Sequence, residues 1–193
     1  MKISIINYDS VSAEHILKLL NKINISVKLI TDEINICNSD IIIMPDCNDL
    51  LKANRKLQLF NLSNVIKIIN KKIIGINNGM FLMCSNIIGC NSSGLGLFHS
   101  DVYKFNETQT HNFLFSDLNT TKQACVKLEN LEGGVRFNSS YYILENDNTC
   151  ISAKINRIPI SILNKHNNYI GLNLDLSDEN ETDCKLLYKI IGA

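Results

Sequence analysis

The chain has 193 residues, 45% of them hydrophobic, which is enough apolar side chain to bury one sizeable core. Lys plus Arg and Asp plus Glu both number 19, so the formal net charge is zero and the chain lacks the basic excess that neutralises a phosphate backbone. The composition predicts one globular domain over residues 1–193 and argues against nucleic acid as a partner.

The lengths of the apolar runs and the pattern of the cysteines indicate the cellular compartment of the protein. Runs such as Ile41–Pro45 and Ile73–Ile76 fall far short of the roughly 20 residues that a bilayer span needs, and the N-terminus leads straight into a strand-like segment. We therefore expect a cytoplasmic protein without a membrane contact. The cysteines are odd in number and lack a C-x-x-C pair, which argues against a disulfide framework and a zinc site. They are Cys37, Cys47, Cys84, Cys90, Cys125, Cys150 and Cys184.

The first ninety residues alternate strand patterns with helix patterns. Lys2–Asn7 is a β-branched run, and Ser12 is a candidate N-cap for a helix over Ala13–Asn21. Asp40–Met44 is continuously apolar, as strands buried on both faces are. This alternation predicts right-handed βαβ crossovers and a mostly parallel, doubly wound α/β sheet. The further elements expected here are a strand at Ile25–Ile30, a helix at Leu50–Asn70, a strand at Lys72–Ile76 and a helix at Gly79–Ile87.

The second half of the sequence has a different pattern of apolar and turn residues. Short apolar runs alternate with Asn, Gly and Ser turns, and only Asp183–Ile191 has a helical pattern. We expect an antiparallel strand extension of the parallel sheet, without a domain boundary. Its strands are expected at Val102–Phe105, Ala124–Leu128, Tyr141–Leu144, Ile151–Ile155, Ile158–Leu163 and Tyr169–Leu174.

One turn stands out, the Gly-Ile-Asn-Asn-Gly sequence at residues 75–79. In a doubly wound sheet, ligands bind beyond the carboxyl ends of the strands, and a strand–turn–helix elbow there presents one side chain. Such an elbow needs glycines for close backbone approach, and Gly75 and Gly79 bracket Asn77 in this way. The alternative is an ordinary β-to-α turn in which Gly79 relieves crowding.

A series of short segments decides between these interpretations. Gly75–Phe81 resembles the G-I-C-x-G-M-Q elbow of class I glutamine amidotransferases, and later segments follow in the family's order over nearly the whole chain. The series is most similar to the glutaminase subunits of imidazole glycerol phosphate synthase, an enzyme of histidine biosynthesis. The other matching segments are Gly94–Phe98 for G-L-G-L-I, Ser139–Tyr142 for H-S-Y-Y, Ile158–Ile160 for a proline-containing strand start, and Gly171–Ser177 for G-V-Q-F-H-P-E.

The resemblance implies a flavodoxin-like core and nucleophilic acyl transfer, in which a thiolate attacks the glutamine amide and a glutamate-held histidine moves the proton. Carried over by position, the nucleophile is Asn77, the histidine is Asp175 and the glutamate is Ser177, so all three are substituted. A carboxamide has no proton to give up, an aspartate is a poorer base than imidazole, and a serine cannot orient a cation. The resemblance therefore implies a glutaminase that has lost its activity.

The resemblance also places a binding site around the elbow. The family's glycine-rich oxyanion loop aligns with Pro45, Asp46, Cys47 and Asn48, where Asp46 brings the wrong charge to a developing oxyanion. The chemistry needs neither a cofactor nor a metal, so we expect none, and glutamine binding is itself in doubt. The substrate-binding positions carried over are Gly75, Gly79, Met80, Phe81, Ser139, Ser140 and Tyr141.

Three functional hypotheses remain open on the sequence. The first is a degenerate glutaminase-like subunit that forms a heterodimer with a cyclase/synthase (β/α)8-barrel and has a structural or regulatory role. The second is an enzyme with altered chemistry that uses Asp175 or Cys47, although none of the four histidines falls at a motif position. The third is a module that binds a small amide or amino acid at Asn77 without a barrel partner.

Overall fold

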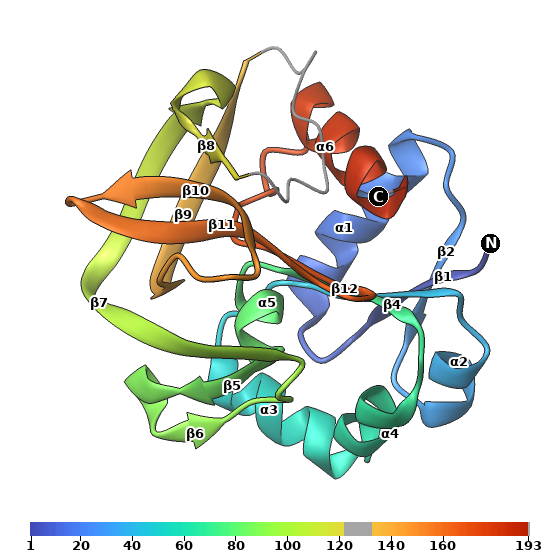
Figure 1. Cartoon of the computed structure of the whole chain (residues 1–193). Helices are drawn as coiled ribbons and strands as arrows, with labels where there is room; N and C mark the ends of the chain where they lie inside the picture. Colours follow the sequence, from blue (N-terminus) through green and yellow to red (C-terminus); the bar gives the residue numbers. More distant parts are fainter. Residues whose placement is uncertain (122–132, 193) are drawn as a thin grey trace.

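The structure is a computed structural model that describes residues 1–121 and 133–192. An eight-stranded sheet runs through the molecule in the order β2-β1-β3-β4-β12-β11-β10-β8 (Figure 1). The pairs from β2 to β12 are parallel, and β11, β10 and β8 add an antiparallel extension. Its strands are β1 (Ile3–Ile6), β2 (Val27–Ile30), β3 (Ile41–Met44), β4 (Lys72–Ile76), β8 (Asn119–Thr120), β10 (Thr149–Ile155), β11 (Ile158–His166) and β12 (Tyr169–Leu172).

Helices cover both faces of the parallel part of this sheet. In Figure 1, α1 and α6 lie on one face, and α2, α3, α4 and α5 lie on the other. The mostly parallel α/β fold with an antiparallel extension, expected from the sequence, is confirmed. The helices are α1 (Ser10–Lys22), α2 (Glu33–Cys37), α3 (Leu50–Leu59), α4 (Leu62–Ile68), α5 (Asn78–Leu82) and α6 (Glu181–Gly192), with 3-10 turns η1 (Ile88–Cys90) and η2 (Phe115–Asp117).

A second sheet of four strands, ordered β6-β5-β7-β9, packs beside α5. Its strands are β5 (Cys84–Ile87), β6 (Ser92–Ser93), β7 (Phe98–Leu114) and β9 (Gly134–Ile143). The long pair β7–β9 is antiparallel and has an irregular register between Lys104 and Gln109. This pair carries the segment Ser139–Tyr141 toward the elbow region, since α5 also contacts β9.

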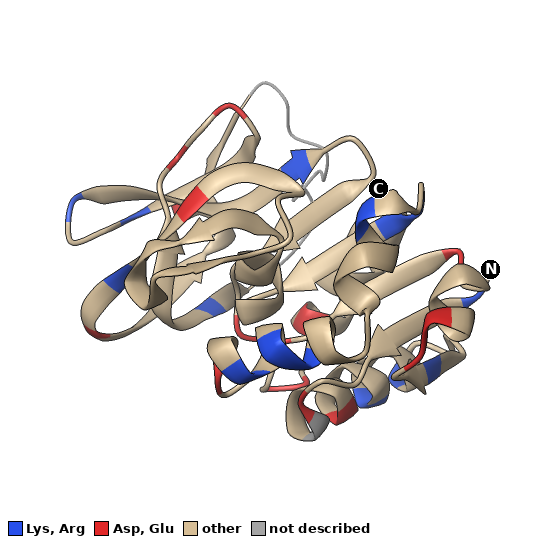
Figure 2. Ribbon diagram, turned by 90° about the horizontal axis from the view of Figure 1, so that it is seen from below, with Lys and Arg blue, Asp and Glu red and all other residues tan. Residues whose placement is uncertain are grey.

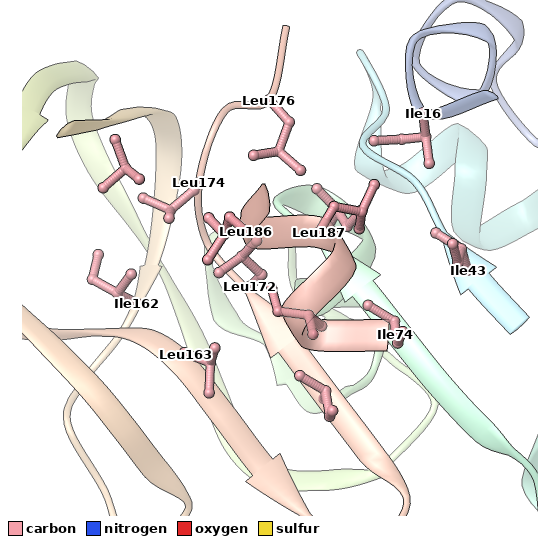
Figure 3. Close-up of a cluster of buried hydrophobic side chains, with 14 of the residues drawn as sticks. Ile16, Ile43, Ile74, Ile162, Leu163, Leu172, Leu174, Leu176, Leu186 and Leu187 are labelled. Carbon is pink, nitrogen blue, oxygen red and sulfur yellow. The ribbon is translucent and has the colours of Figure 1, made fainter. Parts of the chain in front are cut away.

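Two buried clusters fill the two faces of the main sheet. Figure 3 shows part of the cluster under α1 and α6, where Ile16, Leu186 and Leu187 pack on Ile43, Ile74 and Leu172 of the sheet. The other cluster joins α3, α4 and α5 to the opposite face and to the second sheet. Burial on both faces explains why β3 is apolar at every position and β1 at every position except Ser4, which is also buried.

Two helix predictions are wrong in detail. The helix expected over Leu50–Asn70 is two helices, α3 and α4, because Asn61 between them has a φ of 55°. The helix expected over Gly79–Ile87 ends at Leu82, and the chain then forms β5. The carbonyl oxygens of Leu82 and Met83 accept hydrogen bonds from the returning segment at Leu95 and Leu97, so they are not available to continue a helix.

The strand expected at Ala124–Leu128 lies outside the described residues. Lys and Arg residues are interspersed with Asp and Glu residues along the described ribbon (Figure 2), as the balanced composition implies. No helix in the described ranges 1–121 and 133–192 has the length and hydropathy to cross a bilayer.

Candidate functional site

The elbow expected from the sequence is present at the carboxyl end of β4. Asn77 has φ 48° and ψ −115°, a conformation that L-residues rarely adopt and that lies outside the left-handed helical region. A Cβ on Gly79 would lie 2.1 Å from the carbonyl oxygen of Met44, and a Cβ on Gly75 would lie 2.7 Å from the backbone of Met80. Both glycines are therefore required by close backbone approach.

The side chain of Asn77 points into the protein and is only 5% exposed. Its Nδ2 donates to Oδ2 of Asp46 at 3.1 Å and to the carbonyl oxygen of Asn138 at 3.2 Å. Its Oδ1 is buried and has no hydrogen-bond partner within the described part of the chain. Asn77 thus serves as a donor to the groups around it, while its Oδ1 remains a buried acceptor.

The carboxylate of Asp46 occupies the position of an oxyanion. Its Oδ1 accepts from the backbone N–H of Cys47 at 2.7 Å and from that of Asn78 at 3.2 Å. In a nucleophile elbow, the oxyanion hole is made by the N–H of the residue after the nucleophile and by an N–H from a loop after a neighbouring strand. Asn78 follows Asn77, and Cys47 follows β3, so both donors of such a hole converge on Asp46.

The loop Pro45–Asn48 that carries Asp46 is fixed on both sides. The hydroxyl of Tyr8 donates to the carbonyl oxygen of Pro45, and the backbone N–H of Asn48 donates to Asp9 Oδ2 at 2.9 Å. Asn78 Nδ2 donates to the carbonyl oxygen of Cys47 at 2.6 Å. These contacts hold the carboxylate of Asp46 in the hole.

Burial raises the pKa of Asp46 from its ordinary 3.8 to about 6, against the opposing effect of its hydrogen bonds. Below about pH 4 both the folded and unfolded chains hold this proton, and between about 4 and 6 only the folded chain does. The contribution of Asp46 to the free energy of unfolding therefore falls as the pH rises through this window.

We expect Asp46→Asn to raise the free energy of unfolding at about pH 7.5 by on the order of 2 kcal/mol, and to have a much smaller effect at about pH 4. Urea unfolding of both proteins at the two pH values measures the difference. Comparing variant with wild type removes the contribution of Asp183, whose pKa burial also raises to about 6. An equal effect at both pH values would contradict the raised pKa of Asp46 in the folded chain.

Asp175 and Ser177 lie next to each other at the end of β12, but they form no catalytic pair. The carboxylate of Asp175 accepts from Ser177 N at 3.0 Å and Asn138 Nδ2 at 3.3 Å, and it lies 3.5 Å from Nε of Arg136. The Ser177 residue is exposed, and its contact with Asp175 is through the backbone N–H. Asp175 is therefore a structural acceptor that ties β12 to β9.

A small cavity of about 50 Å³ lies beside these residues, at the carboxyl ends of the parallel strands. His15 of α1 reaches it, and His15 Nδ1 lies 2.9 Å from Oε1 of Glu179. Oε2 of Glu179 also accepts a hydrogen bond from Nζ of Lys22 at 3.2 Å. The residues that line the cavity are Ser12, His15, Ile16, Asp46, Ile76, Leu174, Asp175, Leu176 and Ser177.

The remaining positions expected to bind substrate are distributed between the core and β9. Met80 and Phe81 are fully buried in the core. Ser139 is buried and accepts from the backbone N–H of Tyr141, whereas Ser140 pairs with Thr108 on the neighbouring strand. None of these five side chains lines the cavity at Asp46.

Neither Cys47 nor Cys84 is placed to act as a nucleophile at the elbow. Cys47 and Cys84 are both buried, and burial raises the pKa of each thiol well above its ordinary value. A thiol in such surroundings stays protonated and unreactive near neutral pH. In ranges 1–121 and 133–192, no group of three or more His, Cys, Asp and Glu side chains is close enough to hold a metal ion.

The sequence did not reveal four residues of this site. Arg136 and Asn138 hold Asp175, and His15 pairs with Glu179 across 164 positions. No local pattern marks them, because each becomes significant only through a partner that the fold brings close. The one available signal was the resemblance of Gly171–Ser177 to the family's G-V-Q-F-H-P-E segment, which implied that Asp175 lies near the elbow.

Comparisons with known proteins agree with this fold. No family model matches the chain. Imidazole glycerol phosphate synthase subunit HisH from two Bacteroides fragilis strains is 24% identical over 174 residues, which covers 88% of this chain and of the relative. Among solved structures, a glutamine amidotransferase superposes with a TM-score of 0.73 at 10% identity over 99% of both chains.

A second solved structure, PurLQS from Thermotoga maritima, has a TM-score of 0.62 at 15% identity and covers 99% of this chain and 97% of that chain. The structural likenesses show the fold, and the weak sequence similarity links the chain to HisH. The resemblance seen in the sequence is therefore confirmed, and the chain is class I glutamine amidotransferase-like.

Proposed function

We propose that the chain is a HisH-like subunit of imidazole glycerol phosphate synthase that no longer hydrolyses glutamine. In this proposal it forms a heterodimer with a cyclase/synthase (β/α)8-barrel and acts as its structural or regulatory partner. The similarity to HisH along 88% of the chain supports the docking role, because it spans the whole scaffold and not a single motif.

The position of Asp46 carries the proposed loss of glutamine hydrolysis. Amide hydrolysis through a nucleophile passes through a negatively charged tetrahedral oxygen that backbone N–H groups must receive. Here the N–H groups of Cys47 and Asn78 already bind the Asp46 carboxylate. An incoming oxyanion would have to displace this group and would face its negative charge.

The nucleophile and the base support the same conclusion. The Asn77 amide has no ionisable proton, and its Nδ2 is engaged by Asp46 and Asn138. The carboxylate of Asp175 is engaged by Arg136, Asn138 and the Ser177 backbone. Neither group can generate a nucleophile at the elbow.

The test is to co-express the chain with a barrel-type cyclase and to purify the pair. We expect the two chains to co-elute, and the complex to form product from ammonium while the rate with glutamine is lower by about 10⁴-fold or more. A glutaminase subunit of known activity with its own barrel serves as the positive control. Comparable rates with glutamine and ammonium would refute the loss of hydrolysis, and separate elution would refute the docking role.

A further inference from the structure

A groove lies at the amino ends of β1 and β2, at the opposite end of the parallel strands from Asn77. It is lined by residues 1–4 and 26–28 and by Asn35, Asn38 and Ser39, and we call it the amino-end groove. Its volume is about 510 Å³, within the range of roughly 300–1,000 Å³ that is usual for small-molecule sites. The groove is therefore separate from the crevice at the elbow and large enough for a metabolite.

The amino-end groove exists because one face of the sheet is only partly covered there. Ile3 and Ile5 of β1 belong to the cluster under α1 and α6, so Lys2 and Ser4 point to the opposite face. Ser4 pairs with Lys28 of β2, so Lys28 shares this face. The helix on this face, α2, has only five residues and leaves the start of β1 and β2 uncovered (Figure 1).

Two lysines supply the charge of the amino-end groove. From the rise along a strand and the spacing between strands, the Cα atoms of Lys2 and Lys28 lie about 8 Å apart, so their long side chains can converge on one anion. Neither lysine forms an ion pair with a carboxylate among the described residues. No Asp or Glu lines the groove within the described part of the chain.

Two carboxylates lie near the groove, and both have donors of their own. Asp32 accepts from the backbone N–H of Asn35 at 2.9 Å and from Asn35 Nδ2 at 2.6 Å, and Asp40 accepts from the backbone N–H of Lys2 at 2.7 Å. The backbone hydrogen bonds are the main cause of the lowered pKa of each carboxyl, and the charges of Lys28 and Lys2 contribute less. Both ammonium groups therefore remain available to a ligand.

The neutral groups of the groove orient Lys28 and form the floor. Asn35 Oδ1 accepts from Lys28 Nζ at 3.0 Å, which leaves two of the three ammonium protons for a ligand. Ser4 is the one polar residue of β1, and its hydroxyl oxygen lies 2.7 Å from that of Ser39. Both serines are at least 95% buried, so the floor of the groove is polar although the strand around it is apolar.

The kinds of side chain in the groove select the ligand. Lysine binds phosphate as a point charge, whereas carboxylates are matched best by the planar fork of arginine, and the groove has no arginine among its described residues. It also has no aromatic side chain on which a nucleobase could stack, but Ser26 and Asn38 add polar groups beyond the lysines. We propose that the amino-end groove binds a soluble sugar phosphate, with the phosphate at Lys2 and Lys28. This site goes beyond the proposed function, because it needs neither a barrel partner nor glutamine.

The experiment is a calorimetric titration of the isolated full chain with glucose 6-phosphate at about pH 7.5 and low salt, where the phosphate is doubly charged. We expect saturable binding with a Kd on the order of 1 mM or lower. Inorganic phosphate should bind at least about threefold more weakly, because it lacks the hydroxyl groups, and glucose should not bind. Equal affinity for both phosphates would contradict a sugar phosphate site, and absence of saturable binding would refute the site.

Backbone ¹H–¹⁵N NMR of the same titration locates the ligand. We expect the amide signals of Ser4 and Lys28 to shift and those of Asn77 and Gly79 to stay unchanged. Shifts at Asn77 and Gly79 alone would place the ligand at the elbow and overturn the proposal. Sedimentation with vesicles that carry phosphatidylinositol 4-phosphate tests a lipid source of the same chemistry. We expect the chain to stay in the supernatant, and binding to vesicles without binding to glucose 6-phosphate would contradict a soluble ligand.

Variants separate the groove from general effects of charge. Lys2→Gln and Lys28→Gln each remove one cation and are expected to weaken glucose 6-phosphate about fivefold or more, with an unchanged unfolding midpoint. Ser26→Ala should weaken glucose 6-phosphate and leave inorganic phosphate unaltered. The matched control is Lys154→Gln, which removes an exposed lysine of β10 outside the groove. Unchanged affinity in both Lys2→Gln and Lys28→Gln would refute the site. The assay uses no barrel and no glutamine, so its result is independent of the test of the proposed function.

Discussion

Gly79→Ala is expected to destabilise the protein by about 3 kcal/mol or more. An added Cβ would lie 2.1 Å from the carbonyl oxygen of Met44 and 2.6 Å from that of Pro45. Both contacts are with backbone atoms at the end of β3, so no side-chain rotation relieves them. The change would push α5 away from β3 and disturb the loop that carries Asp46.

Urea unfolding monitored by circular dichroism measures this effect. The matched control is Gly192→Ala in the last turn of α6, because no atom lies within 4 Å of a Cβ at that position. We expect this control to stay within about 0.5 kcal/mol of wild type. If Gly79→Ala were as stable as the control, the close approach of α5 and β3 would be wrong.

Asn77→Cys is expected to leave glutamine-dependent turnover about 10⁴-fold or more below the ammonium-supported rate. The new thiol would lack a base, since Asp175 is held by Arg136 and Asn138. The oxyanion donors would still be occupied by Asp46. Members of a catalytic unit act together, so restoring one member restores little.

The measurement is glutamate release from glutamine by the purified complex, with a combined variant as the comparison. The combined variant carries Asn77→Cys, Asp46→Gly, Asp175→His and Ser177→Glu. It removes the carboxylate from the oxyanion hole and supplies a histidine base with a glutamate to orient it. We expect turnover to rise in the combined variant and to stay at background in Asn77→Cys. Measurable turnover in Asn77→Cys alone would overturn the interpretation of the site.

The parallel part of the fold was predictable because its strands are marked by apolar runs. Residues Ile41–Met44, for example, are buried at every position. Elements that depend on pairing with distant segments were harder to predict. The strand β7 extends to Leu114 through a polar, largely exposed stretch, and only its pairing with β9 makes that stretch a strand. The five-residue helix α2 buries only Ile36, so its hydrophobic pattern is too short to detect.

The functional site also has features that the sequence predicts and features that it does not. The elbow at Asn77 was predictable, since closely spaced glycines after an apolar strand require close backbone approach. The negative charge of Asp46 in the oxyanion loop was also predicted. The sequence did not predict that the Asp46 carboxylate itself accepts hydrogen bonds from the N–H groups of Cys47 and Asn78. That result depends on how the loop after β3 meets the start of α5, which no local sequence pattern specifies.

The Asp46 carboxylate is in effect an intramolecular ligand. It is covalently attached next to one of the two N–H groups that it binds, so its effective concentration at the site far exceeds that of any free solute. Any free anion must compete with it, and raising the concentration of that anion does little to displace a tethered group. A transition-state analogue designed for a glutaminase would therefore fail on this chain even where its shape fits.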